Sequence, residues 1–96
     1  MKIKDLPRFS FNIGNTLEDE YDVVATNEGI SVNGEIKGGY EDIELESGHD
    51  LIDAIYDAIE GCDEIAYNDK LELGDVLYND AALDIMEWCD EEKIFN

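Results

Sequence analysis

Basic side chains are scarce in this sequence. Six Lys and Arg stand against 26 Asp and Glu in 96 residues, so the formal net charge is −20. A surface of this sign attracts basic partners and repels nucleic acid and anionic membrane leaflets, so direct DNA binding is disfavoured. The excess is greatest from Glu41 to Glu92, where nineteen acids and a single base, Lys70, give a net charge of −18.

Residues that often carry catalysis or hold zinc are also few. The only histidine, His49, lies at the start of a predicted helix, and we expect a hydrated surface residue rather than half of a nucleophilic pair. Cys62 and Cys89 are the only cysteines and lack the close Cys-x-x-Cys spacing of zinc sites, so we expect buried free thiols. Cysteines used in this way are typical of a reducing cytoplasm.

Two further kinds of pattern are missing. The sequence has no apolar run of about 18 residues and no recognisable signal peptide, so we expect a cytoplasmic protein rather than a membrane protein. Gly34 and the pair Gly38-Gly39 do not form the glycine patterns that cradle phosphates. Carboxylate pairs for acid/base catalysis cannot be singled out among 26 acids. We therefore predict a protein that is not an enzyme and uses no cofactor.

The apolar content nevertheless predicts a folded chain. Hydrophobic residues make up 44% of the sequence, including five Tyr, three Phe and one Trp, which is well above the level of disordered acidic tails. A chain of 96 residues fits one domain with one modest core. We expect a single domain over residues 1–96.

The first half of the chain alternates apolar and polar residues, as half-buried strands do. Residues 8–14 and 21–26 predict two strands, and Asn27-Glu28-Gly29 predicts a hairpin turn into a third. The third strand is interrupted at Asn33-Gly34, which indicates either a second turn or a bulge. Residues 40–46 predict either an acidic edge strand or an irregular connection.

Helical patterns begin in the middle of the chain. Ser47 and Asp50 resemble a capping box ahead of a helix over residues 48–60, and Gly61 is the expected end of this helix. The apolar residues of this helix fall on one side and its acids on the other. Residues 62–77 are ambiguous, because their apolar positions fit a short helix, a strand or both.

A last helix is predicted from Asn79 or Asp80 as its N-cap to about Glu92. We expect it to bury Ala82, Ile85, Met86 and Cys89, with Trp88 alongside. Leu83 falls on the acidic side, where it is either a contact with another part of the chain or an apolar anchor in a charged interface. Strands followed by helices favour an α+β domain, with an antiparallel sheet of three to four strands in the N-terminal half and two or three helices after it.

The acids of the predicted helices form rows. Carboxylates three or four residues apart on a helix recur about every 4.5–6 Å, and DNA offers one phosphate about every 3.4 Å along each strand. Such a surface predicts a DNA mimic that binds a basic nucleic-acid-binding protein through its carboxylates. The candidate partner-binding residues are Glu41, Asp42, Glu44, Glu46, Asp53, Asp57, Glu60, Asp63 and Glu64. The last helix is a reserve surface.

The chain resembles the small acidic inhibitors that phages use against host defence nucleases, especially anti-CRISPR proteins directed at Cas9. The resemblance lies in the opening Met1-Lys2-Ile3-Lys4-Asp5-Leu6, in Gly39-Tyr40-Glu41-Asp42 before a helix and in Tyr78-Asn79-Asp80. It implies an inhibitor that works in the cytoplasm of an infected bacterium and occupies the site where a CRISPR effector nuclease recognises duplex DNA. One departure is that the opening segment contains Pro7 and looks strand-like where a first helix is expected.

Two alternatives share some of these features. An immunity protein that plugs the basic active site of a toxin nuclease would have the same size and acidity. An acidic calcium-binding protein is the other, since hard cations prefer oxygen ligands. Its candidate ligands are Asp63, Glu64, Asn68, Asp69, Glu72 and Asp75, but their spacing does not match an EF-hand loop.

Overall fold

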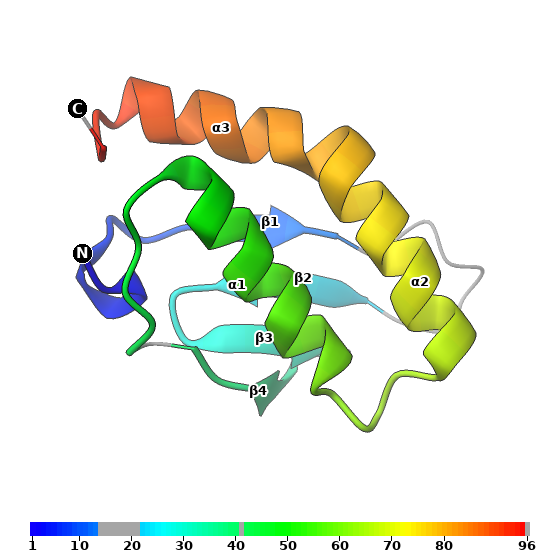
Figure 1. Ribbon diagram of the computed structural model, residues 1–96. Helices are drawn as coiled ribbons and strands as arrows, with labels where there is room; N and C mark the ends of the chain where they lie inside the picture. Colours follow the sequence, from blue (N-terminus) through cyan, green and yellow to red (C-terminus); the bar gives the residue numbers. More distant parts are fainter. Residues whose placement is uncertain (14–21, 41, 96) are drawn as a thin grey trace.

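A four-stranded sheet and a layer of helices make up the described chain, which in this computed structural model comprises residues 1–13, 22–40 and 42–95. A 3-10 turn (Ile3–Asp5) precedes strands β1 (Ser10–Asn12), β2 (Val23–Thr26), β3 (Gly29–Val32) and β4 (Glu35–Gly38). Helices α1 (Gly48–Glu60), α2 (Tyr67–Val76) and α3 (Ala82–Glu91) follow, with a π-helical turn (Leu77–Ala81) between the last two. Figure 1 shows the helices on one side of the sheet. The predicted α+β class is confirmed.

The sheet is an antiparallel meander in the order β1-β2-β3-β4. Asn27 and Glu28 form the predicted hairpin turn, since Thr26 pairs with Gly29 on either side of them. Asn33-Gly34 is a second turn, and its backbone φ angles of 51° and 90° lie in the left-handed region that Asn and Gly tolerate. A register shift also lies between Ile30 and Ser31 in the pairing of β3 with β4.

The side chain of Asn27 holds the N-terminal segment against the first hairpin. Its Nδ2 donates hydrogen bonds to the carbonyls of Ile3 (3.3 Å) and Leu6 (3.1 Å). Its Oδ1 accepts one from the N–H of Phe9 (2.8 Å). The opening segment is thus a 3-10 turn followed by residues without regular structure up to β1, and Asn27 bonds it at several points.

The connection from β4 to α1 is irregular in its described part, residues 39–40 and 42–47. Only an isolated bridge between Lys2 and Glu44 joins it to another segment in the manner of a strand. The alternative of an acidic edge strand is therefore wrong for these residues, because their backbone pairs with the N-terminal segment and not with β4. Glu41 lies outside the described residues.

Helix α1 has the predicted bounds. Ser47 is its N-cap, and its Oγ accepts a hydrogen bond from the N–H of Asp50 (3.4 Å). The carboxylate of Asp50 in turn accepts from the N–H of Glu46 (2.7 Å), which satisfies a backbone donor ahead of the helix. Its buried side is formed by Leu51, Ile52, Ala54, Ile55 and Ile59.

The last helix differs from the prediction. No N-cap lies at Asn79 or Asp80, because both residues sit in the π-helical turn that joins α2 to α3. Backbone angles remain right-handed helical from Val76 through Ala82, so residues 67–91 form one helical run. Burial of Leu77 and Ala81 in this turn overrides the preference of Asn and Asp for helix starts. The ambiguous stretch 62–77 therefore ends in a helix that begins at Tyr67.

The predicted burial of α3 holds only in part, and Ala82, predicted to be buried, is half-buried. Met86, predicted to be buried, is 38% exposed, because it lies at the edge of the buried side and reaches over the N-terminus of α1 instead. Leu83 is 72% exposed, so the alternative that it packs against another part of the chain is wrong. Ile85 and Cys89 are buried as predicted.

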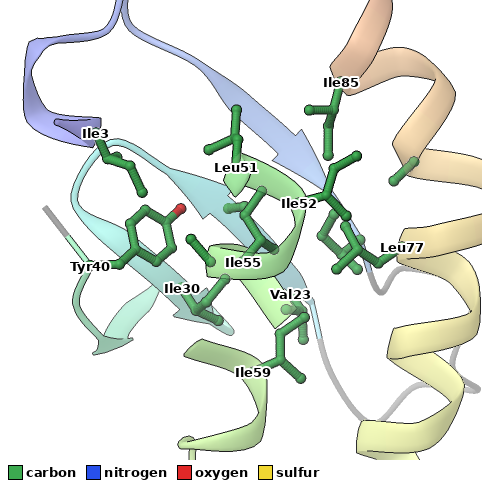
Figure 2. Close-up of a cluster of buried hydrophobic side chains, with 14 of the residues drawn as sticks. Ile3, Val23, Ile30, Tyr40, Leu51, Ile52, Ile55, Ile59, Leu77 and Ile85 are labelled. Carbon is green, nitrogen blue, oxygen red and sulfur yellow. The ribbon is translucent and has the colours of Figure 1, made fainter. Parts of the chain in front are cut away.

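One hydrophobic cluster fills the space between the sheet and the helices. Figure 2 shows Ile3, Ile30 and Tyr40 converging with side chains of α1 and of the helical run. Tyr40 also donates a hydrogen bond from its hydroxyl to the carbonyl of Thr26. At one end Trp88 packs on Phe9 (5.4 Å between ring centroids) and Phe11 (5.5 Å), which holds α3 against β1. Cys62 and Cys89 are buried free thiols, as predicted.

Candidate interaction surface

The negative charge is concentrated on the helices. We define the helix layer as α1 together with the helical run 67–91. These two segments carry twelve acids and one base, Lys70, which gives a net charge of −11. Each of these carboxylate residues is exposed or half-buried. The core therefore lies beneath a surface with almost no basic side chain.

The ion pairs of the described chain lie outside the helix layer. Asp42 pairs with Lys4 (3.3 Å), and Glu44 pairs with the N-terminal amino group (2.7 Å). Lys37 lies between Glu35 (2.9 Å) and Glu64 (3.7 Å). Lys70 bonds a backbone carbonyl, that of Glu60 at 2.7 Å. Among the residues described, no carboxylate of the helix layer is neutralised by an ion pair.

These pairs separate the predicted partner-binding residues into two groups. Asp42, Glu44 and Glu64 are already engaged with positive groups of the chain itself. The amino group of Met1 lowers the pKa of the Glu44 carboxyl, chiefly by a hydrogen bond and then by its charge. Such pairs are exposed to solvent and weak. They nevertheless leave less charge for a partner in this region than the sequence suggests.

The other predicted acids that the structure describes are exposed and lie on or beside α1. Asp53, Asp57 and Glu60 form a row along the outer side of α1, at the expected spacing of four and three residues. Asp63 is exposed just after the helix, and Glu46 is exposed just before it. The structure thus brings three of the nine predicted residues together on one helix.

Asp53 is held in place by a tyrosine of the π-helical turn. The hydroxyl of Tyr78 donates a hydrogen bond to Oδ1 of Asp53 (2.7 Å). The Tyr78 ring meets that of Tyr56 edge to face, with 5.6 Å between ring centroids. Partial burial raises the pKa of Tyr78 well above its usual range, and the bond to Asp53 and the charge of Asp57 raise it further. Sequence reasoning missed this contact, because Tyr78 and Asp53 are far apart in the chain.

A crevice of 260 Å³ lies beside Asp57. Its other walls come from α1 and from the chain around β4 and after it, and they include Gly38, Gly39, Ile43 and Ala58. These walls are mostly apolar or backbone. The crevice therefore offers an apolar surface next to an exposed carboxylate, which suits the aliphatic stem and charged head of Lys or Arg.

A second row of acids runs along α3 and the turn before it. Asp80, Asp84, Glu87 and Glu91 are all exposed and recur at intervals of four, three and four residues. From the sequence, the last helix was predicted only as a reserve surface for the partner. The structure places it on the same layer as the α1 row, because the helical run packs beside α1 (Figure 1).

The face of the sheet away from the helices is different in character. Asn12, Val24, Ser31 and Ile36 are neighbours across the four strands on this open face. It is hollowed by a depression of 550 Å³ whose charged lining residues are Lys4, Arg8, Asp22 and Glu28, two of each sign. The charged lining of this depression is thus balanced, whereas the helix layer carries a net charge of −11.

Other kinds of site lack support. In residues 1–13, 22–40 and 42–95, no three His, Cys, Asp or Glu side chains come together in a way that could hold a metal ion. No helix in this part of the chain has the length and apolar character needed to cross a membrane. Comparisons with protein-family models, with curated proteins and with solved structures found no match.

Proposed function

We propose that this protein is an inhibitor that binds the DNA-binding surface of a CRISPR effector nuclease and blocks target DNA by presenting carboxylates in place of phosphates. The observation that supports it best is the helix layer, with twelve acids, one base and no ion pair to its carboxylates among the described residues. The resemblance of the sequence to anti-CRISPR proteins supplies the class of nuclease.

Mimicry of a phosphate backbone requires charges at regular intervals on a rigid support. Helical rise places acids four and three residues apart at about 6 and 4.5 Å along each row, against about 3.4 Å between phosphates of one DNA strand. Two rows on neighbouring helices then present two lines of charge, as the two strands of a duplex do. The packed core beneath both helices keeps these lines fixed.

Electrostatics would govern the approach of the partner more than the final affinity. A basic groove and an acidic helix layer attract at long range, which raises the association rate and makes it fall as salt is added. Asp57 is the best candidate for a hot spot, because the adjacent crevice lets a Lys or Arg of the nuclease lose water as it pairs. Loss of such a pair costs about 2–5 kcal/mol of binding free energy.

The test is capture of the tagged protein's partner from a lysate that contains a CRISPR effector nuclease, with short duplex DNA as competitor. Three variants that replace acids by amides locate the interface. The first changes the α1 row (Asp53→Asn, Asp57→Asn, Glu60→Gln) and the second the α3 row (Asp80→Asn, Asp84→Asn, Glu87→Gln). The matched control removes three charges that the chain already pairs (Asp42→Asn, Glu44→Gln, Glu64→Gln).

We expect the nuclease to be retained, to be displaced by duplex DNA, and to be retained less by one or both row variants than by the control. Equal loss in all three variants would leave only a diffuse charge effect. Retention of a toxin nuclease in place of the CRISPR nuclease would identify an immunity protein instead. Absence of any basic partner at low salt would refute the proposed mimicry.

A further inference from the structure

Besides Tyr67 and Leu71 on α2, the helix layer exposes three large apolar side chains between the π-helical turn and the middle of α3. Tyr78, Leu83 and Met86 are 45%, 72% and 38% exposed. Leu83 and Met86 are three residues apart on α3, which makes them neighbours on its surface. We call these three residues the apolar row. A mimic of phosphates has no use for them, since the DNA backbone offers no comparable apolar side chain.

The π-helical turn brings Tyr78 into line with the other two. At this turn the N–H of Ala82 donates to the carbonyl of Leu77, five residues back. In a regular α-helix, residues five apart point about 140° away from each other. The wider turn reduces that angle and so brings Tyr78 and Leu83 nearer to one side of the helical run. Turns of this kind inside α-helices are frequent at functional sites.

Both ends of the row are fixed against α1. At one end, the Tyr78 hydroxyl bonds Asp53 and its ring packs against Tyr56. At the other end, a Cβ placed on Gly48 would lie 2.5 Å from Sδ of Met86, so the methionine lies closely over the start of α1. A row held in this way loses little conformational freedom when a partner covers it.

The charges around the apolar row determine which kind of partner can bind over it. Asp84, Glu87 and Asp90 are exposed next to it on α3, and Asp53 borders it on α1. A second copy of this chain is a poor partner, because two helix layers of net charge −11 would face each other. The complement is a basic segment with an apolar side chain in its middle.

We propose that the apolar row is a docking site for an amphipathic basic helix of the partner, whose leucine-like side chain packs on Leu83 while its Lys and Arg meet the surrounding acids. This inference rests on the proposed function and adds to it. The acids attract any basic surface, and the row selects one that also carries an apolar side chain. Substitutions in the row are then expected to speed dissociation at every salt concentration, whereas losses of acid slow association mainly at low salt.

Two synthetic peptides test this without the nuclease. Both carry the same number of lysines, and one has leucines spaced along one side of a helix where the other has serines. Their affinities for the full-length protein are measured by fluorescence anisotropy at low and moderate salt. The variant is Leu83→Ser with Met86→Ser, and the matched control is Ile36→Ser on the open face, where Ile36 is 48% exposed. Circular dichroism checks that each variant is folded.

We expect the lysine–leucine peptide to bind about tenfold more tightly than the lysine–serine peptide, as burial of about one leucine provides. The row variant removes most of that difference at both salt concentrations, and the Ile36→Ser control keeps it. Equal binding of the two peptides, or equal loss in the row variant and the control, would overturn the inference. The proposed function has its own refutation: the peptides could behave as expected while duplex DNA does not compete with this protein for the captured nuclease.

Discussion

Replacement of Asn27 by alanine tests how the N-terminal segment is held. The side chain makes short hydrogen bonds to Phe9 N–H (2.8 Å) and Leu6 carbonyl (3.1 Å) and a longer one to Ile3 carbonyl (3.3 Å), all part-buried. At about 1 kcal/mol for each of the two shorter bonds, with up to about 1 kcal/mol for backbone groups left without a partner, Asn27→Ala should destabilise the fold by about 2–3 kcal/mol. For a domain of this size that lowers the melting temperature by roughly 10–20 °C.

The assay is urea unfolding followed by the fluorescence of Trp88, the only tryptophan, which packs against Phe9 next to the bonded segment. Asn79→Ala, at an exposed residue of the π-helical turn, is the matched control and should change stability little. Asn27→Asp keeps an acceptor for the Phe9 N–H but turns a carboxylate oxygen toward three backbone carbonyls, so we expect it to be no more stable than Asn27→Ala. A loss below about 0.5 kcal/mol for Asn27→Ala, the level of an ordinary surface substitution, would refute this account.

Three further predictions concern the helix layer. Gly74→Ala places a Cβ 2.7 Å from Cε1 of Tyr56, so the ring must move and the unfolding free energy should fall by about 1–3 kcal/mol; an unchanged urea midpoint would show that the ring yields freely. The raised pKa of Tyr78 favours its neutral form in the folded state, so its contribution to stability is full below the ordinary tyrosine pKa of about 10 and is lost as the pH rises through the folded value. In an absorbance titration of tyrosines, Tyr78→Phe should remove the last group to ionise and Asp53→Asn should make Tyr78 ionise earlier, whereas ionisation of Tyr78 together with the other tyrosines would contradict the contact. Because the twelve acids of the helix layer repel one another, added NaCl should raise the melting temperature, and a fall with salt would mean that ion pairs outweigh this repulsion.

Local patterns predicted those parts of the fold whose causes are local. The alternation at Phe9, Phe11 and Ile13, the Asn27-Glu28 turn and the Ser47 cap each depend on residues within a few positions, and each is present in the structure. The predicted start of the last helix was wrong, because Asn79 and Asp80 favour helix caps only where the chain is free to leave the helix. Burial of Leu77 and Ala81 against the rest of the core removes that freedom, and no window of sequence contains this information.

The candidate surface was predicted only in part for a similar reason. Spacing alone placed Asp53, Asp57 and Glu60 on one side of a helix, as the structure shows. Spacing could not reveal that Asp42 meets Lys4 or that Glu64 meets Lys37, since these partners are distant in the chain. Nor could it show that the helical run lies beside α1 and adds its own acids to the same layer. The exposure of Leu83 was one of two alternatives that only tertiary structure distinguishes.

The most direct test of the proposed function is competition between this protein and short duplex DNA for a purified, guide-loaded CRISPR effector nuclease, measured at several salt concentrations. The account predicts that the two are mutually exclusive, that binding weakens as salt rises, and that amide substitutions on the α1 or α3 row weaken it more than the paired-acid control. Simultaneous binding of protein and duplex DNA to the nuclease, or binding unaffected by either row, would contradict it.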